Sequence, residues 1–236
     1  MNDLTGKIAL VTGSRRGVGR LIAEHLLDQG ATVVGFARGP AAIDHPAHRH
    51  YQVDVADASA VQVAFGAVRR EVGSVEIVVN NAAVLTSQYA MILPPAAAQE
   101  MLNINLFAPF MISREAAKMM RRRRWGRIIN IGSMAASLEP IGDSIYAATK
   151  AGIVTLANVL AKELGPLGVT CNTLAITAID SDMLAQLPRD KVEAIIEKLP
   201  VPRFATPDDI CNVIDFLVSE RSSYITAQTI WLGGVN

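Results

Sequence analysis

The strongest constraint on the fold is a regular alternation of short β-branched runs with longer amphipathic segments. The expected strands are residues 8–11, 32–36, 51–55, 75–79, 127–131, 169–175 and 229–232, and the expected helices are residues 18–29, 58–72, 97–124 with a break near Pro109, 146–164 and 207–219. Strand, helix and strand repeated with right-handed crossovers give a parallel sheet with helices on both faces. The sequence therefore predicts an α/β, doubly wound fold with a seven-stranded parallel sheet.

Length and charge narrow the class of protein further. The 236 residues suit one domain spanning 1–236, and equal totals of 22 basic and 22 acidic residues give no general attraction to nucleic acid or anionic membranes. No apolar run looks long enough to cross a bilayer, and the first residues lack the pattern of a signal peptide. Two cysteines, Cys171 and Cys211, imply no disulfide framework, so we expect a cytoplasmic protein.

A glycine-rich segment, residues 12–19, follows the first expected strand and opens the first expected helix. Glycines let a backbone turn sharply and approach a pyrophosphate, and a helix N-terminus offers free N–H groups to phosphates. This predicts a Rossmann-type dinucleotide site. Its expected residues are Gly13, Ser14, Arg15, Arg16, Gly17, Val18 and Gly19.

The end of the second expected strand indicates which dinucleotide binds. NAD sites place a carboxylate there for the ribose 2′-hydroxyl, whereas this chain has Ala37 followed by Arg38. Guanidinium groups of Arg15, Arg16 and Arg38 suit a 2′-phosphate, although such arginines also occur as solvated surface charges. We expect NADP(H).

Tyr146 and Lys150 lie four residues apart at the start of a helix, so their side chains share one face. A nearby ammonium favours the phenolate and lowers the tyrosine pKa, which prepares Tyr146 for acid-base work. Ser133 follows a strand and can hold a substrate oxygen beside Tyr146. The competing interpretation of the Tyr-Lys pair is an ordinary surface pair.

These segments, together with Asn80-Asn81-Ala82 and Asn105, resemble the short-chain dehydrogenase/reductase family in order and spacing over essentially the whole chain. The resemblance implies three groups of roles. Asp54 and Val55 would contact the adenine, Asn80, Asn81 and Ala82 would lie at the cofactor cleft, and Ile179 and Ser181 would approach the carboxamide. Lys150 would also bind the nicotinamide ribose. Asn105 would occupy a helix kink whose carbonyl holds a water linked to Lys150, or would simply be a polar group facing a neighbour.

The chain departs from the family pattern at Ala83, where glycine is usual, and at Ile176-Thr177, where Pro-Gly is usual. The second departure affects the expected wall beside the nicotinamide. The rest of the substrate wall should come from residues 135–144 and from a lid segment, residues 180–200.

Within the family, β-ketoacyl-carrier-protein reductases are the most similar group. This resemblance implies NADPH-dependent reduction of a ketone to a secondary alcohol, with a 3-oxoacyl thioester as substrate and an acyl carrier protein as a possible partner. One carrier-docking arginine matches Arg124, but the other position holds Leu167. Residues 121–124 equally suit a basic helix C-terminus. A small free or secondary-metabolite ketone, or a regulatory role as a cofactor-binding protein, are alternatives.

Two further expectations concern histidines and assembly. His45, His48 and His50 lie near Asp44, and we interpret them as uncommitted imidazoles of a polar surface loop rather than as metal ligands. The resemblance and the apolar residues of the helices at 97–124 and 146–164 predict a homotetramer, with a homodimer as second choice.

Overall fold

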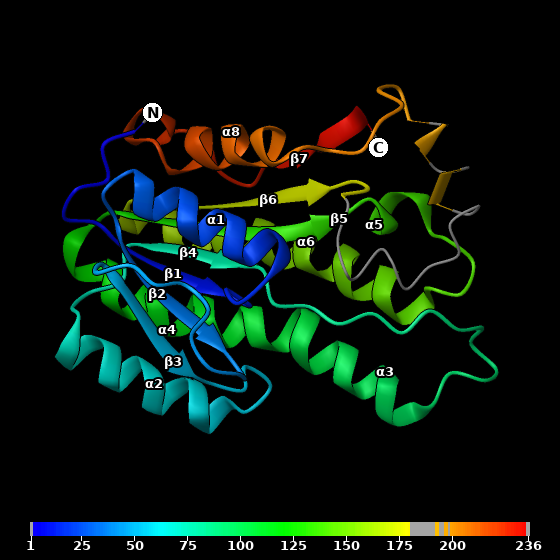
Figure 1. Cartoon of the computed structure of the whole chain (residues 1–236), viewed down its shortest axis with the longest axis horizontal. Helices are drawn as coiled ribbons and strands as arrows, with labels where there is room; N and C mark the ends of the chain where they lie inside the picture. The colour runs from blue at the N-terminus through cyan, green and yellow to red at the C-terminus, as the bar shows by residue number, and fades with distance from the viewer. Residues whose placement is uncertain (1, 180–191, 194–195, 198, 235–236) are drawn as a thin grey trace.

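The computed structural model describes residues 2–179, 192–193, 196–197 and 199–234, built around a seven-stranded sheet (Figure 1). Its strands are β1 Ile8–Thr12, β2 Thr32–Ala37, β3 His48–Gln52, β4 Ile77–Asn80, β5 Gly126–Ser133, β6 Val169–Ile176 and β7 Thr229–Trp231. They pair in parallel in the order β3-β2-β1-β4-β5-β6-β7. The predicted doubly wound sheet is confirmed.

Helices cover both faces of this sheet (Figure 1). They are α1 Gly17–Asp28, α2 Ala58–Glu71, α3 Pro95–Leu102, α4 Ala108–Arg123, α5 Ala135–Leu138, α6 Ser144–Leu164 and α8 Pro207–Val218. Alternate strand residues point to opposite faces. Leu10 of β1 therefore packs with α2, α4 and α6, whereas Ala9 and Val11 pack with α1 and α8. The layers hold the carboxyl ends of all strands at one edge.

The third strand lies three residues earlier than predicted, at His48–Gln52. The prediction at residues 51–55 followed the apolar residues Val53 and Val55, which are buried beyond the end of the strand. Pairing ends at Gln52 opposite Ala37. Beyond it, the Asp54 carboxylate accepts a hydrogen bond from the Ala56 N–H at 3.0 Å and turns the chain toward α2.

The expectation of uncommitted imidazoles is wrong, because all three histidines are hydrogen-bonded; exposed His45 accepts a bond from the Ala47 N–H at 3.1 Å. His48 is buried in β3 with Nδ1 3.2 Å from the Ile43 carbonyl, and His50 Nε2 lies 2.8 Å from the Gly39 carbonyl. Parallel pairing with β2 draws these polar residues into the sheet edge. Among the described residues, no three His, Cys, Asp or Glu side chains are grouped as metal ligands would be.

The long helix expected at residues 97–124 is interrupted, as predicted, but by a π-helical turn. Asn103–Phe107 forms this turn between α3 and α4. Pro109 lies in the first turn of α4 and has no N–H to donate to the Asn105 carbonyl, so regular α-helical bonding fails here. The wider turn places Asn105 inside the fold, next to the site described below.

One stretch, Ser144–Leu167, is long and apolar enough to span a membrane by length and composition, with a mean hydropathy of 1.3 over its most apolar window. The expectation that no such run exists is therefore wrong by this criterion. The stretch includes α6, which packs against β5 and β6. Its buried residues Ala157, Leu160 and Ala161 belong to the core on one face of the sheet, which accounts for part of the apolar composition.

Candidate active site

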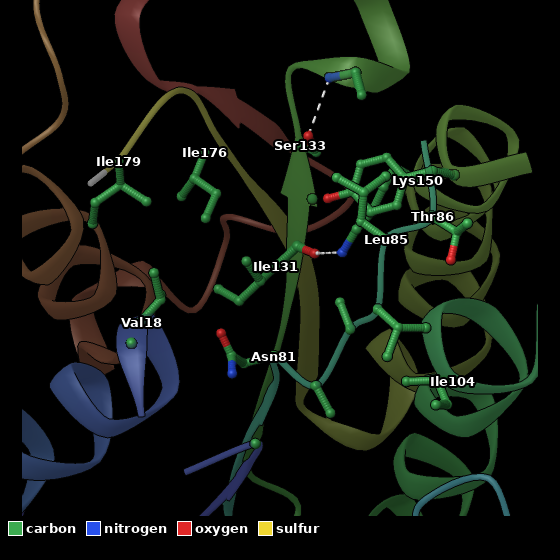
Figure 2. Close-up of a pocket in the computed structure, with 18 of the residues that line it drawn as sticks. Val18, Asn81, Leu85, Thr86, Ile104, Ile131, Ser133, Lys150, Ile176 and Ile179 are labelled. Carbon is green, nitrogen blue, oxygen red and sulfur yellow. Dashed lines mark hydrogen bonds between the residues drawn. The ribbon is translucent and has the colours of Figure 1, made fainter. Parts of the chain in front are cut away.

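A pocket of about 840 Å³ opens at the carboxyl ends of the strands. Ligands of open parallel sheets bind at this edge. Among the predicted site residues, its lining contains Gly13, Arg15, Arg16, Gly17, Val18, Arg38, Asp54, Val55, Asn81, Ala82, Ser133, Tyr146, Lys150 and Ile179. Figure 2 shows Val18, Ile176 and Ile179 on one side of it and Leu85, Thr86 and Lys150 on the other. Ser181 lies outside the described residues.

The loop between β1 and α1 needs glycine at two positions, Gly13 and Gly19, where a side chain would strain the backbone or collide with a neighbour. Gly13 has a φ of +67°, a left-handed conformation that L side chains rarely adopt. A Cβ on Gly19 would collide with the Gly13 carbonyl and the Asn81 amide. Gly19 therefore lies behind the pocket wall and lets α1 approach the loop closely. This is the role of a glycine that sets helix packing in a dinucleotide loop.

The N-terminus of α1 faces the same loop and suits an anion. Its cap residue, Arg16, makes no side-chain capping bond, and the first turn contains no acidic residue. Beneath it, the Thr12 hydroxyl accepts hydrogen bonds from the N–H groups of Asn81 and Ala82, both at 2.9 Å. The Asn81 amide donates to the Thr12 carbonyl. These bonds join the ends of β1 and β4 into a rigid floor.

Two expected cleft residues have their side chains elsewhere. The Ser14 side chain is buried against Gly35 of β2, where any Cβ would collide with its hydroxyl. Asn80 is also buried, and its side-chain amide donates to the Ser113 hydroxyl and to the side-chain oxygen Oδ1 of Asn130. Asn80 thus braces β4 against α4 and β5, and it is absent from the pocket lining.

Basic residues surround the pocket where β2 ends. Arg38 lies directly after Ala37, and the Arg15 guanidinium packs against the Gly39 backbone. Glu100 of α3 also lines the pocket and lies 4.0 Å from Arg38. This pair is exposed, so water screens it and leaves Arg38 available to a more strongly charged partner. The arrangement fits a phosphate at the 2′-position of a dinucleotide.

Ser133, Tyr146 and Lys150 meet on the opposite wall. The Lys150 ammonium is buried and donates to the Ile131 carbonyl at 2.8 Å (Figure 2), and burial lowers its pKa to about 8. Burial also raises the pKa of Tyr146, while the nearby Ser133 side chain lowers that pKa. The Lys150 nitrogen is 5.8 Å from the centre of the Tyr146 ring. Burial thus outweighs the expected lowering of the Tyr146 pKa in this structure.

Asn105 lies behind this wall rather than in it. Its side-chain amide donates to the Val84 carbonyl, and its side-chain oxygen accepts from the Val84 N–H, both at 2.9 Å. A longer bond at 3.3 Å reaches the Thr149 hydroxyl of α6. The side chain therefore ties the π-turn to the irregular segment that follows β4. This supports the simpler interpretation of Asn105 as a polar group that faces its neighbours.

Sequence reasoning missed two charged pocket residues, Glu100 and Asp143. Asp143 precedes α6, and its negative charge raises the pKa of Tyr146. Its position three residues before Tyr146 places the two on one side of a helix start, so the spacing contained a signal. Glu100 gave no comparable signal, because an acid in an exposed helix usually faces water.

Comparisons with known proteins agree with this geometry. Residues 13–235 match the family described as enoyl-(acyl carrier protein) reductase. The 3-oxoacyl-[acyl-carrier-protein] reductase of Vibrio harveyi is 35% identical over 238 residues, covering 98% of each chain. The enzyme of the same name from Aquifex aeolicus is 34% identical over 241 residues, 98% of this chain and 97% of that one.

A solved structure extends the likeness to three dimensions. The crystal structure of a putative gluconate dehydrogenase from Agrobacterium tumefaciens superposes with a TM-score of 0.92 at 31% identity, covering 98% of this chain and 96% of that chain. The names of this family and of these proteins refer to three different substrates: an enoyl-acyl carrier protein, a 3-oxoacyl-acyl carrier protein and gluconate. The comparisons therefore define a family rather than a substrate. The chain belongs to the short-chain dehydrogenase/reductase family, whose members are oxidoreductases that use nicotinamide cofactors.

Proposed function

We propose that this protein reduces a ketone to a secondary alcohol with NADPH. The observation that carries the proposal is that Ser133, Tyr146 and Lys150 line the same pocket as the glycine loop and its arginines. Bound there, NADPH would supply a hydride to the carbonyl carbon. Two buried free cysteines, Cys171 and Cys211, suit the cytoplasm that we propose as its compartment.

The chain's own residues would manage the proton and the carbonyl oxygen. Tyr146 donates its phenolic proton to the oxygen as charge develops on it. The Ser133 hydroxyl, which belongs to the same pocket wall as Tyr146, would hold that oxygen in place. Lys150 would bind the nicotinamide ribose and keep a positive charge near Tyr146, and the Asn105 carbonyl would hold a water that links Lys150 to solvent. The water relay is proposed from the family resemblance.

A 3-oxoacyl thioester is our first candidate substrate, because the relatives from Vibrio harveyi and Aquifex aeolicus carry that activity in their names. An acyl carrier protein would then be a partner. A small free ketone is the second candidate, and one observation favours it. The expected docking residue Arg124 follows α4, where its guanidinium donates to the Pro166 carbonyl. It lies at the opposite end of β5 from Ser133, roughly 23 Å along the strand.

The test of the proposed function is consumption of NADPH with a panel of ketones that includes acetoacetyl thioesters, both free and carrier-bound. Turnover that depends on Tyr146 supports the enzyme. Tight NADPH binding without turnover of any ketone would instead favour a cofactor-binding regulator, since a fold alone does not define an activity.

We expect kcat/KM with NADPH to exceed that with NADH by about tenfold or more, because one charge-assisted contact is worth about 1.4 kcal/mol. The contact would involve Arg38 or Arg15, which lie beside the end of β2. Replacing Ala37→Asp together with Arg38→Ala adds an acceptor for a ribose hydroxyl and removes a cation, so preference should move toward NADH. Equal kcat/KM for the two cofactors in the parent would refute the assignment.

We also propose assembly into a homotetramer, with a homodimer as second choice, through the face formed by α3, the π-turn and α6. An apolar groove on this face is lined by Leu102, Leu106, Phe107, Phe110 and Leu156, and three of these side chains are substantially exposed. Light scattering at micromolar concentration should give a mass above that of one chain. A monomeric mass would contradict both assemblies.

The matched variants for this assembly test place one charge in the groove or away from it. Phe107→Asp should lower the mass, because a buried unpaired carboxylate at an interface is costly. Val63→Asp on α2, where the parent side chain is 74% exposed, should not change it.

A further inference from the structure

Asp143 is a buried carboxylate that nothing in the proposed mechanism uses. The residue is 6% exposed, lines the pocket and precedes α6. Within the described residues its side chain caps no helix N–H, and its buried Oδ1 has no hydrogen-bond partner. Buried polar groups are almost always hydrogen-bonded, and an unpaired buried charge is among the costliest exceptions. Because Asp143 lines a ligand pocket, we expect a bound ligand to supply the hydrogen-bond donor that this carboxylate lacks.

The position of Asp143 assigns it to the substrate half of the pocket. Its charge raises the pKa of Tyr146, so the carboxylate acts within electrostatic range of the proton donor. The loop before it packs against the segment that follows β4, where the Gln88 N–H donates to the Gly142 carbonyl at 2.8 Å. The carboxylate therefore belongs to the same part of the pocket lining as the proton donor.

The pocket lining near Asp143 combines apolar side chains with the neutral polar side chains of Thr86 and Ser87. The described residues that line this half include Leu85, Met134, Leu138 and Ile141. The arginines of the pocket belong to the glycine loop and the end of β2, on the cofactor side. A carboxylate in this setting accepts hydrogen bonds and donates none, so it selects for a donor and against another anion.

We propose that Asp143 is a specificity-determining residue that accepts a hydrogen bond from an O–H or N–H group of the substrate. The inference rests on the proposed function and refines its substrate class to a neutral ketone that carries such a donor beyond the reacting carbonyl. The donor has two possible sources, a hydroxyl of a free hydroxyketone or an amide N–H of a thioester arm. A substrate carboxylate in the same position would be disfavoured.

The experiment compares matched ketones that differ only at the donor. One pair is 4-hydroxy-2-butanone and 2-pentanone, in which a methyl group replaces the hydroxyl. The other is the acetoacetyl thioester of N-acetylcysteamine and its analogue in which an ester oxygen replaces the amide N–H. For each pair, the preference is the ratio of kcat/KM for the donor-bearing ketone to that for its match, measured with NADPH.

We expect Asp143→Leu to lower this preference by about tenfold or more in one of the pairs, which corresponds to about 1.4 kcal/mol. The affected pair identifies the source of the donor. Asp143→Asn retains an acceptor oxygen and should keep part of the preference. The control is Glu139→Gln, which removes the same charge four residues earlier from an exposed position outside the pocket lining and should leave both ratios unchanged.

A measurement on the parent alone covers the case in which the variants fail to fold. The parent should reduce the N-methylamide of 4-oxopentanoate at least about tenfold better, by kcat/KM, than 4-oxopentanoate itself, since the amide offers a donor and the acid offers a second negative charge. Equal rates for these two ketones, or unchanged ratios in active Asp143 variants, would overturn the inference while leaving the proposed function intact. Absence of turnover of every ketone by the parent would overturn the proposed function instead.

Discussion

Replacing Tyr146 by phenylalanine should lower kcat about a hundredfold or more, the scale of general acid catalysis. The substitution removes the phenolic proton but keeps the ring, which is buried beside Met101 and Ala135. Folding and NADPH binding should therefore survive. Burial raises the pKa of Tyr146, so the phenol is protonated at neutral pH and available as a donor.

Two measurements separate this role from a structural one. NADPH dissociation constants and melting temperatures of Tyr146→Phe should match those of the parent. Ser133→Ala should also lose activity at nearly unchanged NADPH affinity, because its hydroxyl lines the pocket on the same wall as Tyr146 and is held by the Ala135 N–H. If Tyr146→Phe keeps more than about a tenth of the parental kcat, the general acid is a different group. The nearest hydroxyl in the sequence, that of Ser144, is not a candidate for this general acid, because Ser144 is exposed and does not line the pocket.

Lys150→Met should abolish most activity, weaken NADPH binding and stabilise the cofactor-free protein. The buried ammonium has a pKa of about 8 against an ordinary 10.5, so the folded state binds fewer protons than the unfolded state between these values. Below pH 8 the full penalty, about 3 kcal/mol, opposes folding, and it disappears as the pH rises through the window to 10.5. Loss of the hydrogen bond to Ile131 offsets about 1–2 kcal/mol of the gain.

Denaturant unfolding of the two proteins without cofactor, at pH 7 and near pH 10, tests this prediction. The variant should be more stable by about 1–2 kcal/mol at pH 7, and its advantage should disappear toward pH 10.5. Lys150→Ala should lose activity and cofactor affinity in the same way, but it leaves a cavity and gains no stability. A Lys150→Met variant that binds NADPH as tightly as the parent would contradict the ribose-binding role.

The fold followed from the sequence because hydrophobic periodicity and glycine punctuation agree along nearly the whole chain. The exception is β3, an edge strand that contains His48, Arg49 and His50. Its pairing with β2 depends on partners distant in the sequence, and local apolarity pointed to Val53 and Val55 instead. The break near Pro109 was predictable from a missing N–H, but its form as a π-turn arises from packing.

Site residues that belong to local sequence motifs were predicted from the sequence. Site residues whose position depends on packing between distant segments were not. The glycine loop, Ser133, Tyr146 and Lys150 meet in one pocket because parallel strands end at the same edge. The side chain of Ser14 does not line the pocket, and the sequence does not reveal that Gly35 leaves room for it behind the wall. Asp143 was missed because an acid before a helix normally caps it, and its failure to do so is visible only in three dimensions.

The most direct test of the central claim follows the hydride itself. NADPH labelled with deuterium at the transferring position would be incubated with the protein and the ketone panel, and the alcohol products analysed by mass spectrometry. The parent should yield a secondary alcohol labelled at the former carbonyl carbon, and Tyr146→Phe should yield about a hundredth as much in the same time. Unlabelled products from every ketone, despite bound NADPH, would contradict reduction at this site.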